Sequence, residues 1–394
     1  MGLLGPGTAP PPGGPGADDR RSGRRTGLPG RSGAGTRSPG TRSPGARAAG
    51  GRDPEPAGGP GERGIVFLAW GAVAGRSAEI AAALGGRSIS LYPPGSGRRP
   101  HAAVRYLHCS VITPWRLRHR PALVVVTNPP VVAGLVTYVA GRVLGFPVAL
   151  DSHPGGFGAQ GDELSRRLWR LHRFLARRVA FSLVAAEPWA AMVEGWGGRA
   201  VVVHEAPMLD LVPVPSDRGR LRVLYVGRFA RDEPVEVVLE AARRSPGVEV
   251  LVTGDPADCP QALRSSAPPN VRFVGFLGPD AYRAAVGGAH AVLTLTTEPG
   301  SVMRAAYEAV YAGRPLLVSD WPLGRELFPY AVHVANEAGS IAGGLAELAA
   351  GYDRLAAVAA VARDAQLARW RGQEGRLRAA IGEELDARNG HHRR

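Results

Sequence analysis

The stretch TEPGSVMRAAYEAVYAGRPLLVSD, residues 297–320, decides the fold of the second half of the chain. The apolar run AVLTLTT leads into it, and the run PLLVSD ends it. The turn-forming residues Glu298-Pro299-Gly300-Ser301 separate the first run from a stretch that is typical of a helix. The pattern therefore predicts a strand, a turn, a helix and a second strand, with Glu298, Arg304 and Glu308 at the mouth of the unit.

Charge at this position indicates a site for an anion or a sugar. A helix N-terminus carries unpaired N–H groups and partial positive charge, so a phosphate can approach the backbone at Gly300 and Ser301. Pro299 and Ser301 also suit the first turn of a helix for capping alone. Arg304 and Glu308, at i and i+4, form either a plain salt bridge or a site where Glu308 binds a ribose diol.

The pattern of this stretch recurs along the chain from Gly64. Apolar runs alternate with helical stretches, and each run is continuous, as in parallel strands covered on both faces. The first six runs are GIVFLAW, SISLY, ALVVVTN, PVALDSH, FSLVAAE and VVVHEA. Six more follow the Pro-rich stretch LVPVPSDRGR: RVLYVGR, VEVLVTG, VRFVGFL, AVLTLTT, PLLVSD and AVHVAN. The sequence predicts two doubly wound, Rossmann-like α/β domains that face a cleft.

These patterns give four segments. Residues 1–62 are a Gly/Pro/Arg-rich tail without aromatic residues, too poor in apolar side chains to fold. Residues 63–212 form the first domain. Residues 213–372 form the second domain. Residues 373–394 form a C-terminal helix and tail.

The composition excludes several classes of protein. The net charge of +14 comes from arginine alone, since the chain has no lysine, and we interpret it as GC-rich coding bias rather than as nucleic-acid binding. The two cysteines, Cys109 and Cys259, cannot form a disulfide framework or a zinc site and indicate a reducing cytoplasm. No apolar run is long enough to span a bilayer, and the N-terminus does not resemble a signal peptide.

The carboxyl ends of the second set of strands hold Arg228, Gly254, Phe276, Glu298 and Asp320. Ligands of open parallel sheets gather at such ends. Arginine can bind a diphosphate through two hydrogen bonds, which makes Arg228 and its neighbour Arg231 candidate phosphate ligands, although two solvated loop arginines are the alternative.

From Val223 to Leu348 the chain resembles the C-terminal domain of GT-B glycosyltransferases, notably the large retaining family 4. The resemblance is carried by VGRF, VTGD, VRFVGFLG and, above all, EAVYAGRPLLVSD. It implies a metal-independent transfer, without other cofactor, of a sugar from a nucleotide-diphosphate sugar to a glycan or lipid-linked acceptor, with retention. A role in bacterial polysaccharide biosynthesis is the expectation.

The resemblance also assigns residues. Arg228 takes the diphosphate, Glu308 the ribose, and Glu298 and His153 join Arg228 as catalytic candidates. The donor-binding set is Gly227, Arg228, Arg231, Gly254, Phe276, Leu277, Gly300, Ser301, Val302, Arg304 and Glu308. The chain departs from the family pattern twice, with Gly300 in place of a Glu and Glu233 in place of a Lys.

In the first domain, two loops provide acceptor-side candidates. AWGAVAGRSAEI supplies Gly71, Gly75 and Arg76, and LDSHPGGFG supplies Asp151 and His153. A His at a strand end near the sugar's reactive carbon matches the family, although a lone His at such a place is often structural. The string Gly156–Gly161 also matches the dinucleotide pattern G-x-G-x-x-G, but it follows the fourth strand rather than the first, which argues against NAD binding.

Two further alternatives stay open. The helix SRRLWRLHRFLARR has an arginine stripe, which is either a solvated face or a peripheral contact with an anionic membrane. The whole chain is either an enzyme or a non-catalytic pair of GT-B-like domains kept for binding a partner.

Overall fold

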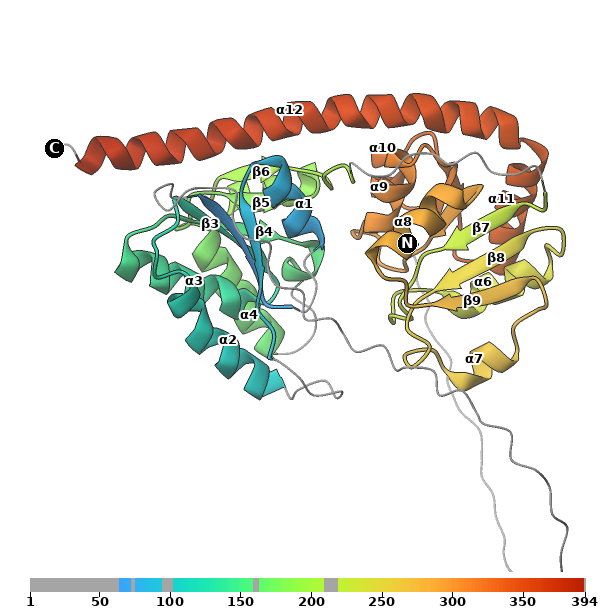
Figure 1. The fold of residues 1–394 in the computed structure, drawn as a ribbon, viewed down its shortest axis with the longest axis horizontal. Helices are drawn as coiled ribbons and strands as arrows, with labels where there is room; N and C mark the ends of the chain where they lie inside the picture. The colour runs from blue at the N-terminus through green and yellow to red at the C-terminus, as the bar shows by residue number, and fades with distance from the viewer. Residues whose placement is uncertain (1–63, 72–74, 94–101, 159–162, 209–218, 393–394) are drawn as a thin grey trace, which may run out of the picture. The chain divides into compact units, whose positions relative to one another are not determined.

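The computed structural model describes residues 64–71, 75–93, 102–158, 163–208 and 219–392 (Figure 1). The tail predicted for residues 1–62 and most of the Pro-rich linker lie outside these residues. Gly161, the last glycine of the dinucleotide pattern, also lies outside them.

The first domain is built on six parallel strands in the order β2-β1-β3-β4-β5-β6. They are β1 (Ile65–Ala69), β2 (Arg87–Ser90), β3 (Leu123–Asn128), β4 (Val148–Ser152), β5 (Ser182–Val184) and β6 (Ala200–Val202). Each coincides with a predicted apolar run, although β2 and β6 begin one residue before theirs. The core strands bury both faces, which explains why their sequences do not alternate in polarity.

Helices cover both faces of this sheet. They are α1 (Gly75–Ala83), α2 (Ala102–Arg116), α3 (Val131–Leu144), α4 (Glu163–Ala176) and α5 (Glu187–Gly195), with the short 3₁₀ helix η1 (Pro154–Gly156). Side chains from α2, α3 and α4 share one core with the strands, and α1 packs in the core on the opposite face. Figure 1 shows α2, α3 and α4 together on one side of the sheet.

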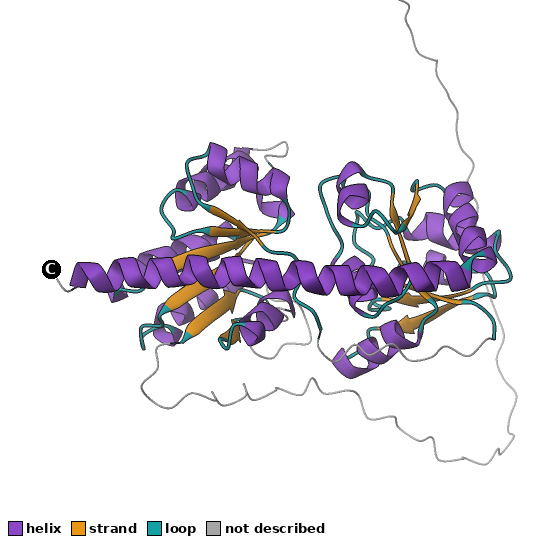
Figure 2. Cartoon of the chain, turned by 90° about the horizontal axis from the view of Figure 1, so that it is seen from above, coloured by secondary structure: helices purple, strands orange, loops and turns teal. Residues whose placement is uncertain are grey.

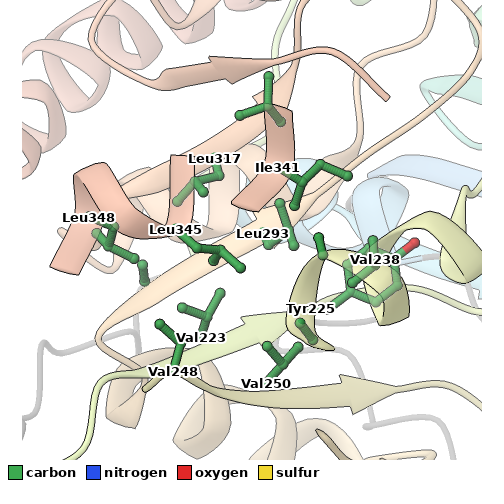
Figure 3. Close-up of a cluster of buried hydrophobic side chains, with 14 of the residues drawn as sticks. Val223, Tyr225, Val238, Val248, Val250, Leu293, Leu317, Ile341, Leu345 and Leu348 are labelled. Atoms are coloured by element: carbon green, nitrogen blue, oxygen red, sulfur yellow. The ribbon is translucent and has the colours of Figure 1, made fainter. Parts of the chain in front are cut away.

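The second domain repeats this architecture, with six parallel strands in the order β12-β11-β10-β7-β8-β9. They are β7 (Arg222–Tyr225), β8 (Glu249–Thr253), β9 (Val271–Gly275), β10 (Ala291–Thr294), β11 (Leu316–Ser319) and β12 (Val332–Val334). The helices are α6 (Val235–Arg243), α7 (Gln261–Ser265), α8 (Pro279–Gly288), α9 (Arg304–Tyr311), α10 (Pro322–Leu327) and α11 (Ala338–Ala350). Figure 3 shows the core between this sheet and α6 and α11, with Tyr225 and Leu293 on the strands.

The strand order of the second sheet reverses between β7 and β10, since β8 and β9 extend to one side and β11 and β12 to the other. A reversal of this kind is a switch point, and ligands of open α/β sheets bind beside the loops that follow the strands there. These are the loops that carry Arg228 and Glu298.

The chain ends in one continuous helix, α12 (Tyr352–His392), drawn at full length in Figure 2. Ala362 packs in a core of the second domain, and Trp370 and Leu377 pack in a core of the first. The domain boundary predicted at residue 372 thus falls inside a helix that packs against both domains. Within the described ranges, no helix combines the length and the apolar content that crossing a bilayer requires.

Candidate active site

The loop after β7 is organised by a buried carboxylate. Glu233 is 7% exposed, and its Oε2 accepts hydrogen bonds from the backbone N–H groups of Arg228 (2.7 Å) and Ala230 (3.2 Å). Burial raises the pKa of Glu233, although these two bonds lower it. Because the carboxylate uses both amides, the loop offers an anion its arginine side chains rather than those two N–H groups.

Those arginines, Arg228 and Arg231, are both exposed, and neither guanidinium forms an ion pair with any carboxylate of the described residues. Between them Phe229 adopts a left-handed conformation, with φ of 60°, which is uncommon for a residue other than glycine. Its ring lies against Gly254, where φ is 121° and a Cβ would lie 2.5 Å from Phe229 Cε2. The close approach explains why position 254 needs glycine.

The loop after β10 is bonded to the loop after β7. The Thr297 N–H donates to the carbonyl of Asp232 (2.7 Å), and the Thr296 hydroxyl donates to the Asp232 carboxylate (3.2 Å). From the other side, the Ser319 hydroxyl accepts from the Thr296 N–H (2.9 Å). Two loops that are 64 residues apart in sequence, measured from Asp232 to Thr296, are therefore held together at the switch point.

The predicted turn is present, but the helix begins later than predicted. The Ser301 N–H donates to the Glu298 carbonyl (3.0 Å), which closes the turn Glu298–Ser301. Helix α9 starts at Arg304, with Met303 as an extended N-cap residue. The prediction that Pro299 and Ser301 lie in the first turn of the helix is thus wrong. The three residues before Arg304 are extended, and they line a pocket instead.

Glu308 lies inside a charged cluster. It is 6% exposed, its Oε1 accepts from Arg304 Nε (2.7 Å), and its Oε2 accepts from the Tyr282 hydroxyl on α8. The Arg304 guanidinium also pairs with Glu79 on α1 of the first domain. The alternative of a salt bridge between Arg304 and Glu308 is confirmed, and it extends to a third residue, Glu79, that sequence reasoning did not identify.

The cluster has more carboxylates than cations, which affects its protonation. Burial raises the pKa of Glu79 to about 7, Arg304 opposes this rise, and Glu308 adds to it. Burial would lower the pKa of Arg304, but Glu308 and then Glu79 raise it overall, so the guanidinium stays charged. Gly75, an acceptor-side candidate, lies directly against the Arg304 guanidinium, because a Cβ there would clash with it.

A second buried ion cluster fixes the end of β4. The Arg76 side chain is 7% exposed and donates to Asp151 Oδ1 (3.2 Å), to Glu205 Oε1 (2.9 Å) and to the carbonyl of Val203 (2.7 Å). Burial would raise the pKa of Asp151, but Arg76 and then His153 bring it below its ordinary value. Asp151 is therefore a carboxylate at neutral pH, held inside the domain.

His153 follows β4 directly and is half-buried, with Nε2 3.4 Å from Asp151 Oδ2. This distance is long for a good hydrogen bond, so the contact orients the ring without using up Nε2. The structure brings together three of the acceptor-side candidates, Arg76, Asp151 and His153. Gly71 lies after β1, before residues 72–74, which are outside the described ranges.

One pocket is lined both by acceptor-side candidates, such as His153, and by donor-side candidates, such as Gly300. Its lining is Arg76, Ser152, His153, Pro154, Ala185, Ala186, Trp189, Glu205, Gly300, Val302 and Leu323. Glu205 Oε2 and Trp189 Nε1 are buried and have no hydrogen-bond partner among the described residues. An acceptor and a donor atom left free in one small pocket suit a ligand with several hydroxyl groups.

Trp189 also explains the glycine at position 300. The ring atom Cζ2 of Trp189 lies 3.0 Å from the place where a Cβ on Gly300 would be. A longer side chain at this position would displace the ring. Gly300 is therefore part of the pocket wall, formed where the turn meets α5.

The remaining donor-side candidates lie at the carboxyl ends of neighbouring strands. The Gly227 N–H donates to the Thr253 hydroxyl (3.1 Å), and Phe276 is 74% exposed, followed by Leu277. Glu298 is exposed on its turn, so its carboxylate faces away from the core. No three His, Cys, Asp or Glu side chains of the described residues gather as metal ligands.

Sequence reasoning missed four residues of this site. Glu79 has a helical signal, since it lies three residues after Arg76 on the predicted helix, and Tyr282 follows the quoted string VRFVGFLG by four residues. Trp189 and Glu205 gave no signal, because each reaches the pocket from a segment with no motif of its own.

Comparisons with known proteins agree with this geometry. Residues 220–354, which contain the second sheet, match the family model described as Glycosyl transferases group 1. No curated protein matches the chain in sequence.

Solved structures share the fold of both domains. Anabaena HepE in complex with UDP and glucose matches with a TM-score of 0.66 and 16% identity, over 81% of this chain and 99% of that one. Sucrose-phosphate synthase from Thermosynechococcus elongatus matches with a TM-score of 0.65 and 16% identity, over 82% of this chain and 100% of that one. The predicted fold class, with two Rossmann-like domains, is confirmed, and the family match of residues 220–354 supports the resemblance to glycosyltransferases in the second domain.

The fold by itself does not distinguish sugar transfer from other reactions of nucleotide sugars. A putative UDP-N-acetylglucosamine 2-epimerase from Listeria monocytogenes also matches, with a TM-score of 0.53 and 13% identity, over 77% of this chain and 95% of that one. The family match of the second domain favours transfer.

Proposed function

We propose that this chain moves a sugar from a nucleotide-diphosphate sugar to an acceptor hydroxyl. The premise is that it has the GT-B fold of glycosyltransferases and that its second domain matches the glycosyl transferases group 1 model. The observation that carries the proposal is the joined pair of loops at the switch point of the second sheet, with Arg228 and Arg231 on one and the Glu298–Ser301 turn on the other. HepE, which shares the fold, has been solved with UDP-glucose, which supports a donor of this class.

The donor's diphosphate would be neutralised by the side chains of Arg228 and Arg231. Guanidinium groups on a fixed loop stabilise negative charge that develops on a departing phosphate, and this electrostatic effect is commonly the largest in such sites. The reaction then needs no metal ion. Retention of configuration would follow if a departing phosphate oxygen accepts the proton of the acceptor hydroxyl.

Glu308 would bind the ribose of the donor. Its two oxygens are engaged by Arg304 and Tyr282 in this structure. Ribose hydroxyls can replace the Arg304 contact without leaving that guanidinium unpaired, because Glu79 holds it as well. The exchange keeps the Arg304 charge paired and leaves the Glu308 carboxylate hydrogen-bonded by the ribose hydroxyls and Tyr282.

The acceptor would enter the pocket lined by His153, Trp189 and Glu205. Glu205 Oε2 can accept a hydrogen bond from one sugar hydroxyl, and Trp189 Nε1 can donate a hydrogen bond to another. His153, oriented by Asp151, lies beside the reacting hydroxyl, and Glu298 holds the hydroxyls of the donor sugar. A glycan or a lipid-linked glycan fits these groups.

The first test is stabilisation by nucleotides. Addition of UDP or GDP should raise the thermal midpoint of the protein, because a ligand that binds only the folded state stabilises it. Nucleotide sugars that stabilise the protein are then tested for hydrolysis and transfer. If no nucleotide diphosphate shifts the midpoint, the alternative of a non-catalytic domain pair is favoured.

The second test assigns the residues. Arg228→Ala and Glu308→Ala should each abolish transfer, and Glu308→Ala should also weaken the nucleotide shift. Arg272→Ala is the matched control, because Arg272 is 65% exposed on β9 and contacts Glu249 at 3.8 Å. Full transfer activity in both site variants would refute the assigned roles.

A further inference from the structure

The outer surface of α2, α3 and α4 is unusually apolar for a surface in contact with water. Nine of the twelve large apolar side chains that are exposed among the described residues lie on these three helices. They are Val104, Leu107, Val111, Trp115, Val139, Val143, Leu164, Leu168 and Phe174. Apolar patches of this kind indicate an interaction surface rather than chance exposure.

The pattern is ordered along α2. Val104, Leu107, Val111 and Trp115 are spaced by three, four and four residues, so they form one stripe along the helix. Leu107 is 69% exposed and Trp115 56%. Because the opposite side of α2 already contributes Cys109 and the partly buried Ile112 to the core, the stripe is a second apolar face without a partner in the described chain.

The charged residues of the same surface are predominantly positive. The three helices contain seven arginines (Arg105, Arg116, Arg142, Arg166, Arg167, Arg170 and Arg173) and a single acidic residue, Glu163. That acid is already paired with Arg166 and Arg167. The surface therefore presents a strong excess of positive charge beside its apolar side chains.

Arginine and aromatic rings also meet here. All four cation–π pairs of the described residues lie on or directly after α2 and α4, including Arg118 over Trp115 at 4.5 Å and Arg178 over Phe174 at 3.8 Å. Tryptophan and arginine side by side suit the boundary between lipid headgroups and acyl chains, where one part of the pair is apolar and the other hydrated.

We propose that this face of α2, α3 and α4 docks the protein on an anionic lipid bilayer, with the α2 stripe inserted among the acyl chains and the arginines in contact with headgroup phosphates. The proposal goes beyond the arginine stripe of α4, since it places the main apolar contact on α2. It does not depend on the proposed transfer reaction, and vesicle binding is measured without donor or acceptor.

Other occupants fit less well. Residues 1–62 have nine arginines against five acids, so this segment is repelled by the surface rather than attracted to it. A second copy of the chain would bring two positive faces together. A nucleic acid would contact the arginines but would leave the exposed leucine, valine and phenylalanine side chains in water.

The test is co-sedimentation of the full-length protein with vesicles of phosphatidylcholine, with or without about one-third phosphatidylglycerol. Binding should require the anionic lipid and should weaken as salt rises. Leu107→Glu should weaken vesicle binding by roughly tenfold or more, because a charge replaces a leucine that inserts among the acyl chains. Arg170→Glu should weaken it by roughly fivefold or more.

The controls carry the same changes elsewhere. Val361→Glu and Arg371→Glu lie at exposed positions of α12, which packs on the opposite face of the first sheet, and both should bind like the unaltered protein. All four variants should keep the circular dichroism spectrum and the thermal midpoint of the unaltered protein. If Leu107→Glu loses either property, Val111→Glu replaces it as the variant that tests the apolar contact.

Four outcomes would overturn the proposal. The first is equal pelleting with neutral and anionic vesicles. The second is unchanged binding in both surface variants. The third is vesicle binding that persists in Leu107→Glu but is lost when Arg20, Arg21, Arg24 and Arg25 are replaced by Ala, which would assign it to residues 1–62. The fourth is a concentration-dependent dimer that Leu107→Glu dissolves, which would assign the face to a second copy.

Discussion

The substitution Arg76→Met tests whether the buried ion cluster holds the first domain together. Methionine keeps much of the volume of the arginine stem but removes the guanidinium. Asp151 is 1% exposed in its side chain and would lose its nearest positive charge, while Glu205 would lose its hydrogen bond. Removing one partner of a buried ion pair leaves an uncompensated charge, which costs about 3–5 kcal/mol.

The loss should depend on pH in a defined direction. In the unaltered protein the pKa of Asp151 lies below its ordinary value, so the stability from its pairing is present above pH ~4 and is lost as the pH falls through the lowered pKa. Without Arg76, the largest remaining influence on the pKa of Asp151 is burial, which raises it. The difference between the two proteins should therefore be largest near pH 7 and shrink toward pH ~4.

The assay is urea unfolding followed by tryptophan fluorescence. Five of the seven tryptophans, Trp70, Trp115, Trp169, Trp189 and Trp196, belong to the first domain, so the signal reports mainly on that domain. Arg87→Met, at an exposed position of β2, is the control and should change stability by less than about 0.5 kcal/mol.

A double variant separates pairing from packing. Asp151→Leu added to Arg76→Met should recover part of the loss, since it removes the unpaired charge. The reasoning is refuted if Arg76→Met costs less than about 1 kcal/mol at pH 7, or if its effect and that of Asp151→Leu simply add.

Three further changes test other parts of the site. Because the pKa of Glu79 is raised to about 7 in the folded protein, stability should fall as pH rises from its ordinary value of 4.5 toward 7. Glu79→Gln should flatten this fall in thermal denaturation, and an unchanged slope would contradict the pKa. Gly254→Ala should cost about 1–3 kcal/mol in urea unfolding, since φ is 121° and Phe229 is in the way. Gly288→Ala, on α8 with open space around it, should not be destabilising. Trp189→Ala should raise the acceptor KM by roughly tenfold while the nucleotide-induced thermal shift stays unchanged, and a lost shift instead would place Trp189 on the donor side.

The sequence by itself determined the secondary structure and the class of fold. Continuous apolar runs separated by helical stretches predicted all twelve strands, since parallel strands covered on both faces need apolar side chains at every position. The same reasoning located Arg228, Glu298 and His153, because ligand-binding loops of parallel sheets follow the carboxyl ends of strands. The resemblance to glycosyltransferases rested on four short strings, above all the one that contains Glu308.

Only the tertiary structure decided which charges share an environment. Arg304 and Glu79 are 225 residues apart, and no local pattern connects them. Trp189 fills the space beside Gly300, where the sequence predicted that a phosphate approaches the backbone. Glu233 accepts hydrogen bonds from two backbone amides of its loop, while the sequence showed it only as a departure from the family pattern. Helix α9 starts at Arg304 rather than near Ser301, and the residues before it line a pocket instead of forming a helical turn. Spacing predicts contacts within one element, while contacts between elements depend on how the sheets and helices pack.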